Sequence, residues 1–115
     1  MEINVRPGPN GWSVITVIGE VPANNADDLR NSIVAEVDAG HFHLVIEFAE
    51  DDYVDSTCLG VLVGGLKRCR AHDGSVNLLV PPGASRFPKI LRMTGLTKVF
   101  GLFETLEEAT MPPET

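Results

Sequence analysis

Short β-rich runs alternate with helix-like segments along most of this chain, and the hydrophobic period switches between two and about 3.6 residues. Strands that are separated by helices need crossover connections, which place parallel strands in one sheet beneath covering helices. The start of the chain differs, because Pro and Gly in RPGPNG (residues 6–11) predict a turn between two β-rich runs. The sequence therefore predicts an α/β fold with a mixed, mostly parallel central β-sheet covered by about four α-helices.

The individual elements follow from this periodicity and from Gly and Pro punctuation. Strands are expected at residues 2–5, 12–21, 43–48, 75–80 and 98–100. Helices are expected from a cap at Asn24 to Gly40, from the 55–57 stretch to Arg70, from Phe87 to Gly95, and over residues 104–110. Basic residues in the last turns suit the dipole of the second helix, and we expect Gly74 to end it.

Length and charge limit the class of function. The 115 residues, 43% of them hydrophobic, fit one globular domain, which we place at residues 1–110 with a C-terminal tail at 111–115. Sixteen acidic residues against nine Lys and Arg give a formal charge of -7, which opposes binding to nucleic acid. No apolar stretch reaches the roughly 20 residues that span a bilayer, and the N-terminus lacks a signal-peptide pattern. We therefore expect a cytoplasmic protein without direct membrane insertion.

The stretch VDSTCLGVLVGGL (residues 54–66) places Asp55, Ser56 and Thr57 side by side where polar sequence gives way to an apolar run. One of them is enough to cap the helix that follows. Three cap-competent residues exceed that need, and a helix N-terminus also favours a phosphate, because its backbone N–H groups and dipole attract negative charge. Capping alone and display of a modified hydroxyl both remain open from these residues.

The chain shows no sequence pattern for catalysis, for a cofactor or for a metal. Cys58 and Cys69 are expected on one helix, about 16 Å apart along its axis, which is too far for a disulfide. Neither belongs to a C-x-x-C pair, and the three histidines do not fall at ligand spacing with them. A serine hydrolase is disfavoured because G-x-S-x-G is absent. We expect no enzyme activity, no cofactor and no metal.

Three glycines interrupt the second helix. Gly60 and Gly64 lie one turn apart and, with Gly65, cost about 1 kcal/mol each relative to alanine, which calls for compensation by close packing. The favoured interpretation is close packing of this helix against the sheet, and the alternative is the approach of a partner's backbone. Candidates for an exposed contact are Val61, Leu62 and Lys67.

Two long segments resemble one family of regulators. VDSTCLGVLVGGLKRCRAHDGSVNLL and ILRMTGLTKVFGLFETLEEA resemble the anti-sigma factor antagonists, which are single STAS domains of bacterial partner-switching systems. The resemblance runs from residue 17 almost to the C-terminus. Its most diagnostic part is the D-S-[ST]-x-L-G pattern at residues 55–60, supported by the later residues Thr94, Gly95, Leu96, Phe100 and Phe103.

This resemblance implies a phosphorylation switch at Ser56. In such proteins the matching serine is phosphorylated by an anti-sigma factor that is also a serine kinase, and a PP2C-type phosphatase removes the phosphate. The unmodified antagonist binds the kinase and frees the sigma factor, so it regulates transcription as a substrate and not as an enzyme. The resemblance places the phosphosite neighbours and the partner contact at Asp55, Thr57, Cys58, Leu59 and Gly60.

The chain departs from the family pattern at two positions. Many members carry an acid before the first helix, where this chain has Pro22, so an acid near the phosphosite is missing. Cys58 stands where glycine or alanine is usual, and a thiol at a helix N-terminus can have a lowered pKa, so redox tuning is an alternative to a plain small residue. STAS domains also serve as accessory subunits of lipid-transport (ABC-type) complexes, which is the alternative function.

Overall fold

The computed structural model of the chain describes residues 2–18, 26–49, 56–84 and 86–112. Within these ranges the strands are β1 (Glu2–Pro7), β2 (Ser13–Ile18), β3 (His43–Phe48), β4 (Ser75–Leu79) and β5 (Gly101–Phe103). The α-helices are α1 (Ala26–Asp38), α2 (Ser56–Arg70), α3 (Arg86–Thr94) and α4 (Leu106–Ala109), and the 3-10 turns are η1 (Pro9–Gly11) and η3 (Leu96–Lys98). Strands and helices alternate after the first two strands, as the hydrophobic periods predict.

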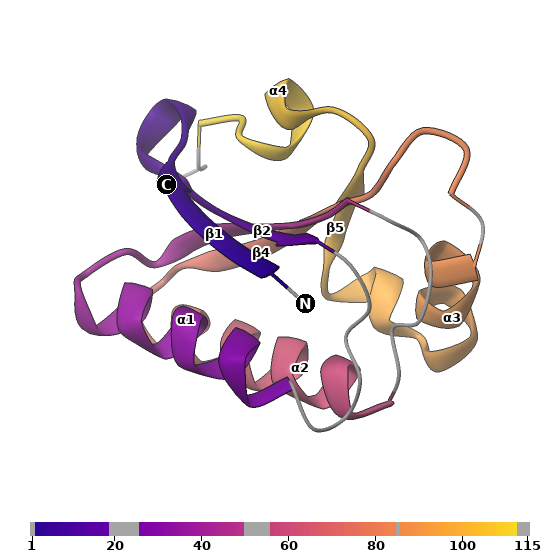
Figure 1. Cartoon of the computed structure of the whole chain (residues 1–115), viewed down its shortest axis with the longest axis horizontal. Helices are drawn as coiled ribbons and strands as arrows, with labels where there is room; N and C mark the ends of the chain where they lie inside the picture. The colour runs from indigo at the N-terminus through magenta and orange to yellow at the C-terminus, as the bar shows by residue number, and fades with distance from the viewer. Residues whose placement is uncertain (1, 19–25, 50–55, 85, 113–115) are drawn as a thin grey trace.

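The strands form one sheet in the order β1-β2-β3-β4-β5, so strands that follow one another in the chain are neighbours in space (Figure 1). β1 pairs antiparallel with β2, while the pairs β2–β3, β3–β4 and β4–β5 are parallel. The predicted turn joins the first pair, with Asn10 at φ 57° and Gly11 at φ 82°. The predicted α/β fold, with a mixed and mostly parallel sheet and four helices, is confirmed.

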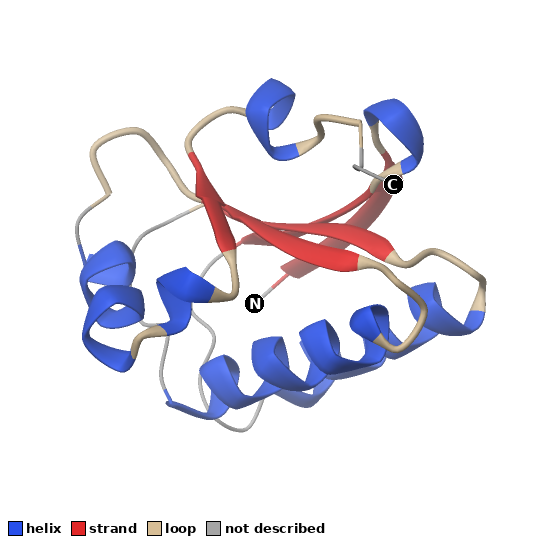
Figure 2. Cartoon of the chain, turned by 180° about the vertical axis from the view of Figure 1, so that it is seen from behind, coloured by secondary structure: helices blue, strands red, loops and turns tan. Residues whose placement is uncertain are grey.

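The main hydrophobic core lies between one face of the sheet and helices α1, α2 and α3. Figures 1 and 2 show α1 and α2 running side by side across this face, with α3 next to them. Alternate residues of the parallel strands point into it, because successive side chains of a strand face opposite sides. The buried strand residues of this cluster are Ile15, Val17, Leu44, Ile46, Phe48, Val76 and Leu78, and buried Val80 follows directly after β4.

The opposite face of the sheet carries a smaller cluster beneath α4. Its buried members are Trp12, Val14, Val45, Leu79 and Ala109. Three side-chain hydrogen bonds fasten the C-terminal segment. The Trp12 indole Nε1 donates to the carbonyl of Met111 at 2.8 Å, the Asn77 amide donates to the carbonyl of Ala109 at 2.9 Å, and the Asn10 amide donates to the carbonyl of Thr110 at 2.8 Å.

The last two predicted elements are shifted along the chain. The strand expected at 98–100 is wrong: a 3-10 turn follows Gly95, whose φ of 76° suits glycine, and buried Phe100 anchors the end of that turn. β5 begins instead at Gly101, where a Cβ would lie 2.6 Å from Oδ1 of Asn77 on β4. The last helix is shorter than 104–110, because the hydroxyl of Thr105 caps it by accepting from the backbone N–H of Glu108 at 3.3 Å.

Three expectations lie partly outside the described residues. The strand predicted over 12–21 is seen as Ser13–Ile18, and residues 19–21 fall outside the description. The cap at Asn24 and the departure at Pro22 also fall outside it. The domain boundary at residue 110 and the tail at 111–115 stay predictions.

Candidate functional site

Helix α2 carries the candidate site at its first turn. Ser56 is the first residue of this helix, whereas Asp55 and the side chain of Ser56 lie outside the described part of the structure. Thr57 and Gly60 are exposed, Leu59 is half-buried, and Cys58 is fully buried at 0% exposure. The four described residues of the neighbourhood predicted for the phosphosite therefore divide into an exposed side and a side that is packed into the core.

The core-facing side of α2 holds this turn in place. Cys58, Leu62, Leu66 and Cys69 recur at intervals of four, four and three residues, and all four belong to the main cluster. Leu62 and Leu66 are buried, while Leu59 and Val63 are half-buried beside them. The prediction that Leu62 makes an exposed contact is wrong, because this residue is 0% exposed.

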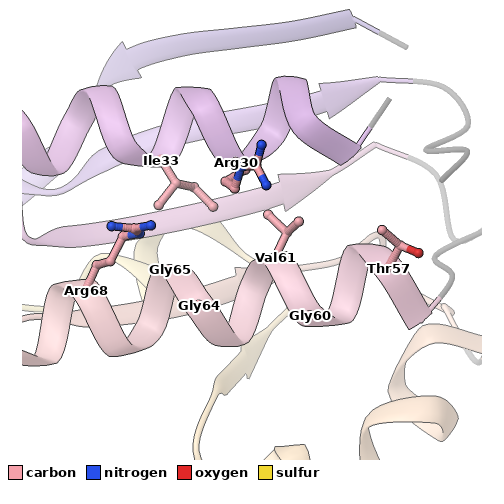
Figure 3. Close-up of a pocket in the computed structure, with 8 residues that line it drawn as sticks. All are labelled: Arg30, Ile33, Thr57, Gly60, Val61, Gly64, Gly65 and Arg68. Atoms are coloured by element: carbon pink, nitrogen blue, oxygen red, sulfur yellow. The ribbon is translucent and has the colours of Figure 1, made fainter. Parts of the chain in front are cut away.

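An open groove lies between α1 and α2 and begins at Thr57, the neighbour of Ser56. Its volume is about 380 Å³. Figure 3 shows α1 and α2 as its two walls, with Thr57 at one end and Arg68 at the other. The lining residues are Arg30, Ile33, Thr57, Gly60, Val61, Gly64, Gly65 and Arg68. The groove is therefore apolar along most of its length and carries two guanidinium groups.

The three glycines of α2 have different roles in this groove. A Cβ on Gly65 would lie 3.1 Å from Cγ2 of Ile33, so this glycine allows close contact with α1. A Cβ on Gly60 or Gly64 would meet nothing within 4 Å, so neither is required by packing within the described chain. The interpretation of close packing against the sheet is wrong, because the close contact is with α1 and occurs at only one of the three glycines.

Sequence reasoning missed the residues that α1 contributes. Arg30 and Ile33 sit more than 20 positions before the motif, and no spacing rule connects them to α2. The helical period of α1 does place both residues on one face, since they are three apart. The missing information was that α1 and α2 pack side by side.

The three basic residues in the last turns of α2 differ in the contacts that they make. Among Lys67, Arg68 and Arg70, which are all exposed, Arg70 donates to the carbonyl of Val99 at 3.5 Å. Lys67 and Arg68 form no ion pair with any residue of the described ranges. Arg30, on the opposite wall of the groove, pairs with exposed Asp27 on its own helix at 3.1 Å.

Both cysteines of α2 are buried, and neither forms a disulfide. Because the thiol of Cys58 is enclosed by the core, its position fits a small core residue and not an accessible redox group. Burial also raises the pKa of the Cys69 thiol from 9.0 to about 11.

The raised pKa of Cys69 predicts a loss of stability at alkaline pH. The unfolded chain releases the thiol proton near 9.0 and the folded chain near 11, so this stabilisation is complete below pH 9 and is lost between pH 9 and 11. Urea unfolding at pH 8 and pH 10 measures the difference, with Cys69→Ala as the control that removes this group. An equal fall in the free energy of unfolding for both proteins would contradict the assignment.

Within the described residues, no group of three or more His, Cys, Asp or Glu could hold a metal ion. None of the helices in the described ranges combines the length and the apolar character needed to cross a membrane.

Solved structures of known proteins share this fold over nearly the whole chain. An anti-sigma factor antagonist from Mycobacterium paratuberculosis is 29% identical, with a TM-score of 0.78 over 94% of this chain and 89% of that one. The Bacillus cell fate determinant SpoIIAA in its phosphorylated form is 21% identical, with a TM-score of 0.73 over 94% of this chain and 96% of that one.

A third structure extends the likeness. A STAS domain anti-sigma-factor antagonist protein from Planctomyces limnophilus is 20% identical, with a TM-score of 0.73 over 94% of both chains. The two structures below 25% identity show the fold alone. The sequence model of the STAS domain family matches residues 1–109, so the chain belongs to the STAS domain family.

Proposed function

We propose that this chain is an anti-sigma factor antagonist that is switched by phosphorylation of Ser56. In the unmodified state it binds an anti-sigma factor that is also a serine kinase and thereby frees a sigma factor. Phosphorylation releases it, and a PP2C-type phosphatase restores it. The chain acts in the cytoplasm as a phosphoprotein and a regulator of transcription, not as an enzyme.

The observation that carries this proposal is the place of the D-S-T motif at the start of α2. Ser56 begins a 15-residue helix whose next turns are fixed in the core through Cys58 and Leu62. The first turn of α2 contains no acidic residue. Backbone N–H groups at a helix N-terminus and the positive end of its dipole favour a phosphate at such a position. Similarity to the Mycobacterium paratuberculosis antagonist over 94% of the chain supports the same assignment.

The geometry also favours a switch that leaves the fold intact. A phosphoserine carries about -1.5 to -2 charges near neutral pH. Thr57, the next residue, is exposed, and Cys58 is the first residue of α2 whose side chain is described as buried in the core. We therefore expect a phosphate on Ser56 to change the charge and shape at the helix start and to leave the core contacts of Cys58 and Leu62 in place.

Ser56→Ala is expected to abolish phosphate incorporation. Intact mass is measured before and after incubation with ATP and the candidate kinase, and fragment mapping then locates the phosphate. Losing one cap interaction costs only about 1 kcal/mol against a typical stability of roughly 5–15, so the variant is expected to stay folded. Thr57→Ala is the matched control, because it removes the adjacent exposed hydroxyl and is expected to keep full labelling.

Two outcomes would contradict the proposed function. Full labelling of Ser56→Ala would move the phosphosite elsewhere. Stable co-purification with a transporter ATPase, without labelling by any serine kinase, would assign the chain to a lipid-transport complex.

A further inference from the structure

The groove between α1 and α2 is kept open by two glycines that the fold does not need. Glycine inside a helix costs about 1 kcal/mol relative to alanine. Gly60 and Gly64 lie on the same side of α2, one turn apart, and a Cβ on either would meet no atom of the described residues within 4 Å. The chain thus carries this cost at two positions where its own packing would accept a side chain.

The two charged residues in the described lining of the groove are both arginines. Arg68 lines it from α2, where it has no ion-pair partner among the described residues. Arg30 lines it from α1, and its pair with Asp27 is exposed to solvent, which makes that pair weak. Among the residues that the structure describes, no acidic side chain lines the groove. In a chain with a formal charge of -7, this positive and apolar surface is complementary to an acidic partner.

We propose that the α1–α2 groove is a docking site for an acidic, amphipathic helical segment of a partner protein. Apolar side chains of the segment lie over Gly60 and Gly64, which are spaced like the i and i+4 residues of a helix. Carboxylates of the segment pair with Arg68 on one wall and Arg30 on the other. A segment with charges on both sides of an apolar stripe fits two cations that stand on different helices (Figure 3).

This inference deepens the proposed function and rests on it only in that the chain acts by binding proteins. The groove starts at Thr57, so a phosphate on Ser56 would add negative charge at one end of it. An acidic segment would be repelled there. The groove and the phosphosite would thus act on the same partner.

The test selects peptides and does not use the anti-sigma factor, so it can fail independently of Ser56 labelling. A display library of 14-residue peptides, with leucines fixed at helical spacing and all other positions random, is selected on the wild-type chain and on Gly64→Leu. Gly64→Leu fills the groove, and the open space around Gly64 predicts that it folds. Circular dichroism checks this, and Gly60→Leu serves as the second variant, since its position is equally open.

The expected result is a set of peptides that are rich in Asp and Glu and are recovered on wild type but not on Gly64→Leu. Recovery of the same peptides on both proteins, no recovery, or peptides without acidic enrichment would overturn the proposal. Saturable binding of dodecanoate in the groove, with no peptide recovered, would also overturn the proposal, because the groove would then be a site for a small amphiphile.

One recovered peptide then tests the charges. Arg68→Glu is expected to weaken its binding at least fivefold, as measured by fluorescence anisotropy. Lys67→Glu is the matched control, because Lys67 is exposed on α2, lies outside the groove lining and gives the same change in net charge. Equal weakening by both variants would show a general charge effect and would overturn the docking geometry.

Discussion

Replacing Gly74 with alanine is expected to lower the free energy of unfolding by about 3 kcal/mol or more, or to prevent folding. A Cβ at this position would overlap the carbonyl oxygen of Phe42 and would lie 2.7 Å from its carbonyl carbon. That carbonyl accepts a hydrogen bond from the backbone N–H of Ser75 at 2.9 Å, at the start of β4. Because the obstacle is backbone at the edge of two paired strands, it cannot be relieved by turning a side chain.

Gly64→Ala provides the matched control for this prediction. It adds the same methyl group to a glycine of the preceding helix, where the added atom meets nothing within 4 Å. Its free energy of unfolding is expected to rise by about 1 kcal/mol, since alanine is the better helix former. Urea denaturation of both variants gives the comparison. A midpoint for Gly74→Ala at or above that of wild type would contradict the close approach of Phe42.

Phosphorylation of Ser56 is expected to weaken binding of the kinase partner at least tenfold, which corresponds to about 1.4 kcal/mol. The reason is the concentration of negative charge at the exposed start of α2, next to Thr57 and the mouth of the groove. Titration calorimetry of the phosphorylated and unmodified chains measures the effect. The circular dichroism spectrum and the melting temperature are expected to stay nearly unchanged, because we expect the core contacts of Cys58 and Leu62 to stay in place.

Two variants separate charge from the loss of the hydroxyl. Ser56→Ala is expected to bind like wild type. Ser56→Asp is expected to weaken binding less than phosphoserine does, because a carboxylate carries less charge and one oxygen fewer than a phosphate. Equal affinities for the phosphorylated and unmodified chains would remove the electrostatic switch. A phosphorylated form that melts at a much lower temperature would replace it with an order-to-disorder mechanism.

The periodicity of the sequence was sufficient to predict the sheet and the helix layers, because each parallel strand here pairs with the strand next to it in the chain. Local contacts that depend on tertiary neighbours were not accessible in this way. Gly74 was expected to end α2, but the positive φ of 60° belongs to Asp73, and Gly74 is needed for the approach of Phe42 from β3. The strand at 98–100 was misplaced because Gly101 has no side chain from which to read a period, although its contact with Asn77 determines where β5 starts.

The candidate site was predictable to a different extent. The motif at residues 55–60 is contiguous, so the sequence alone could place Ser56 at a helix start, where the structure has it. Which residues of that helix face outward depends on what packs against it. Leu62 was for this reason assigned to an exposed contact, although it is buried, and Arg30 was not considered because it comes from another helix.

The two faces of the sheet are covered to different extents, because α4 is a small helix. One face is covered by α1, α2 and α3, whereas the other is closed by four residues of helix and by the bonds that Trp12 and Asn77 donate to the C-terminal segment. Segments with few buried contacts open at free energies below that of global unfolding. We therefore expect the C-terminal segment that carries α4 to open from the sheet and close again while the strands stay paired. Amide exchange in this protein should accordingly proceed at two levels, a low one for this segment and a high one for the sheet.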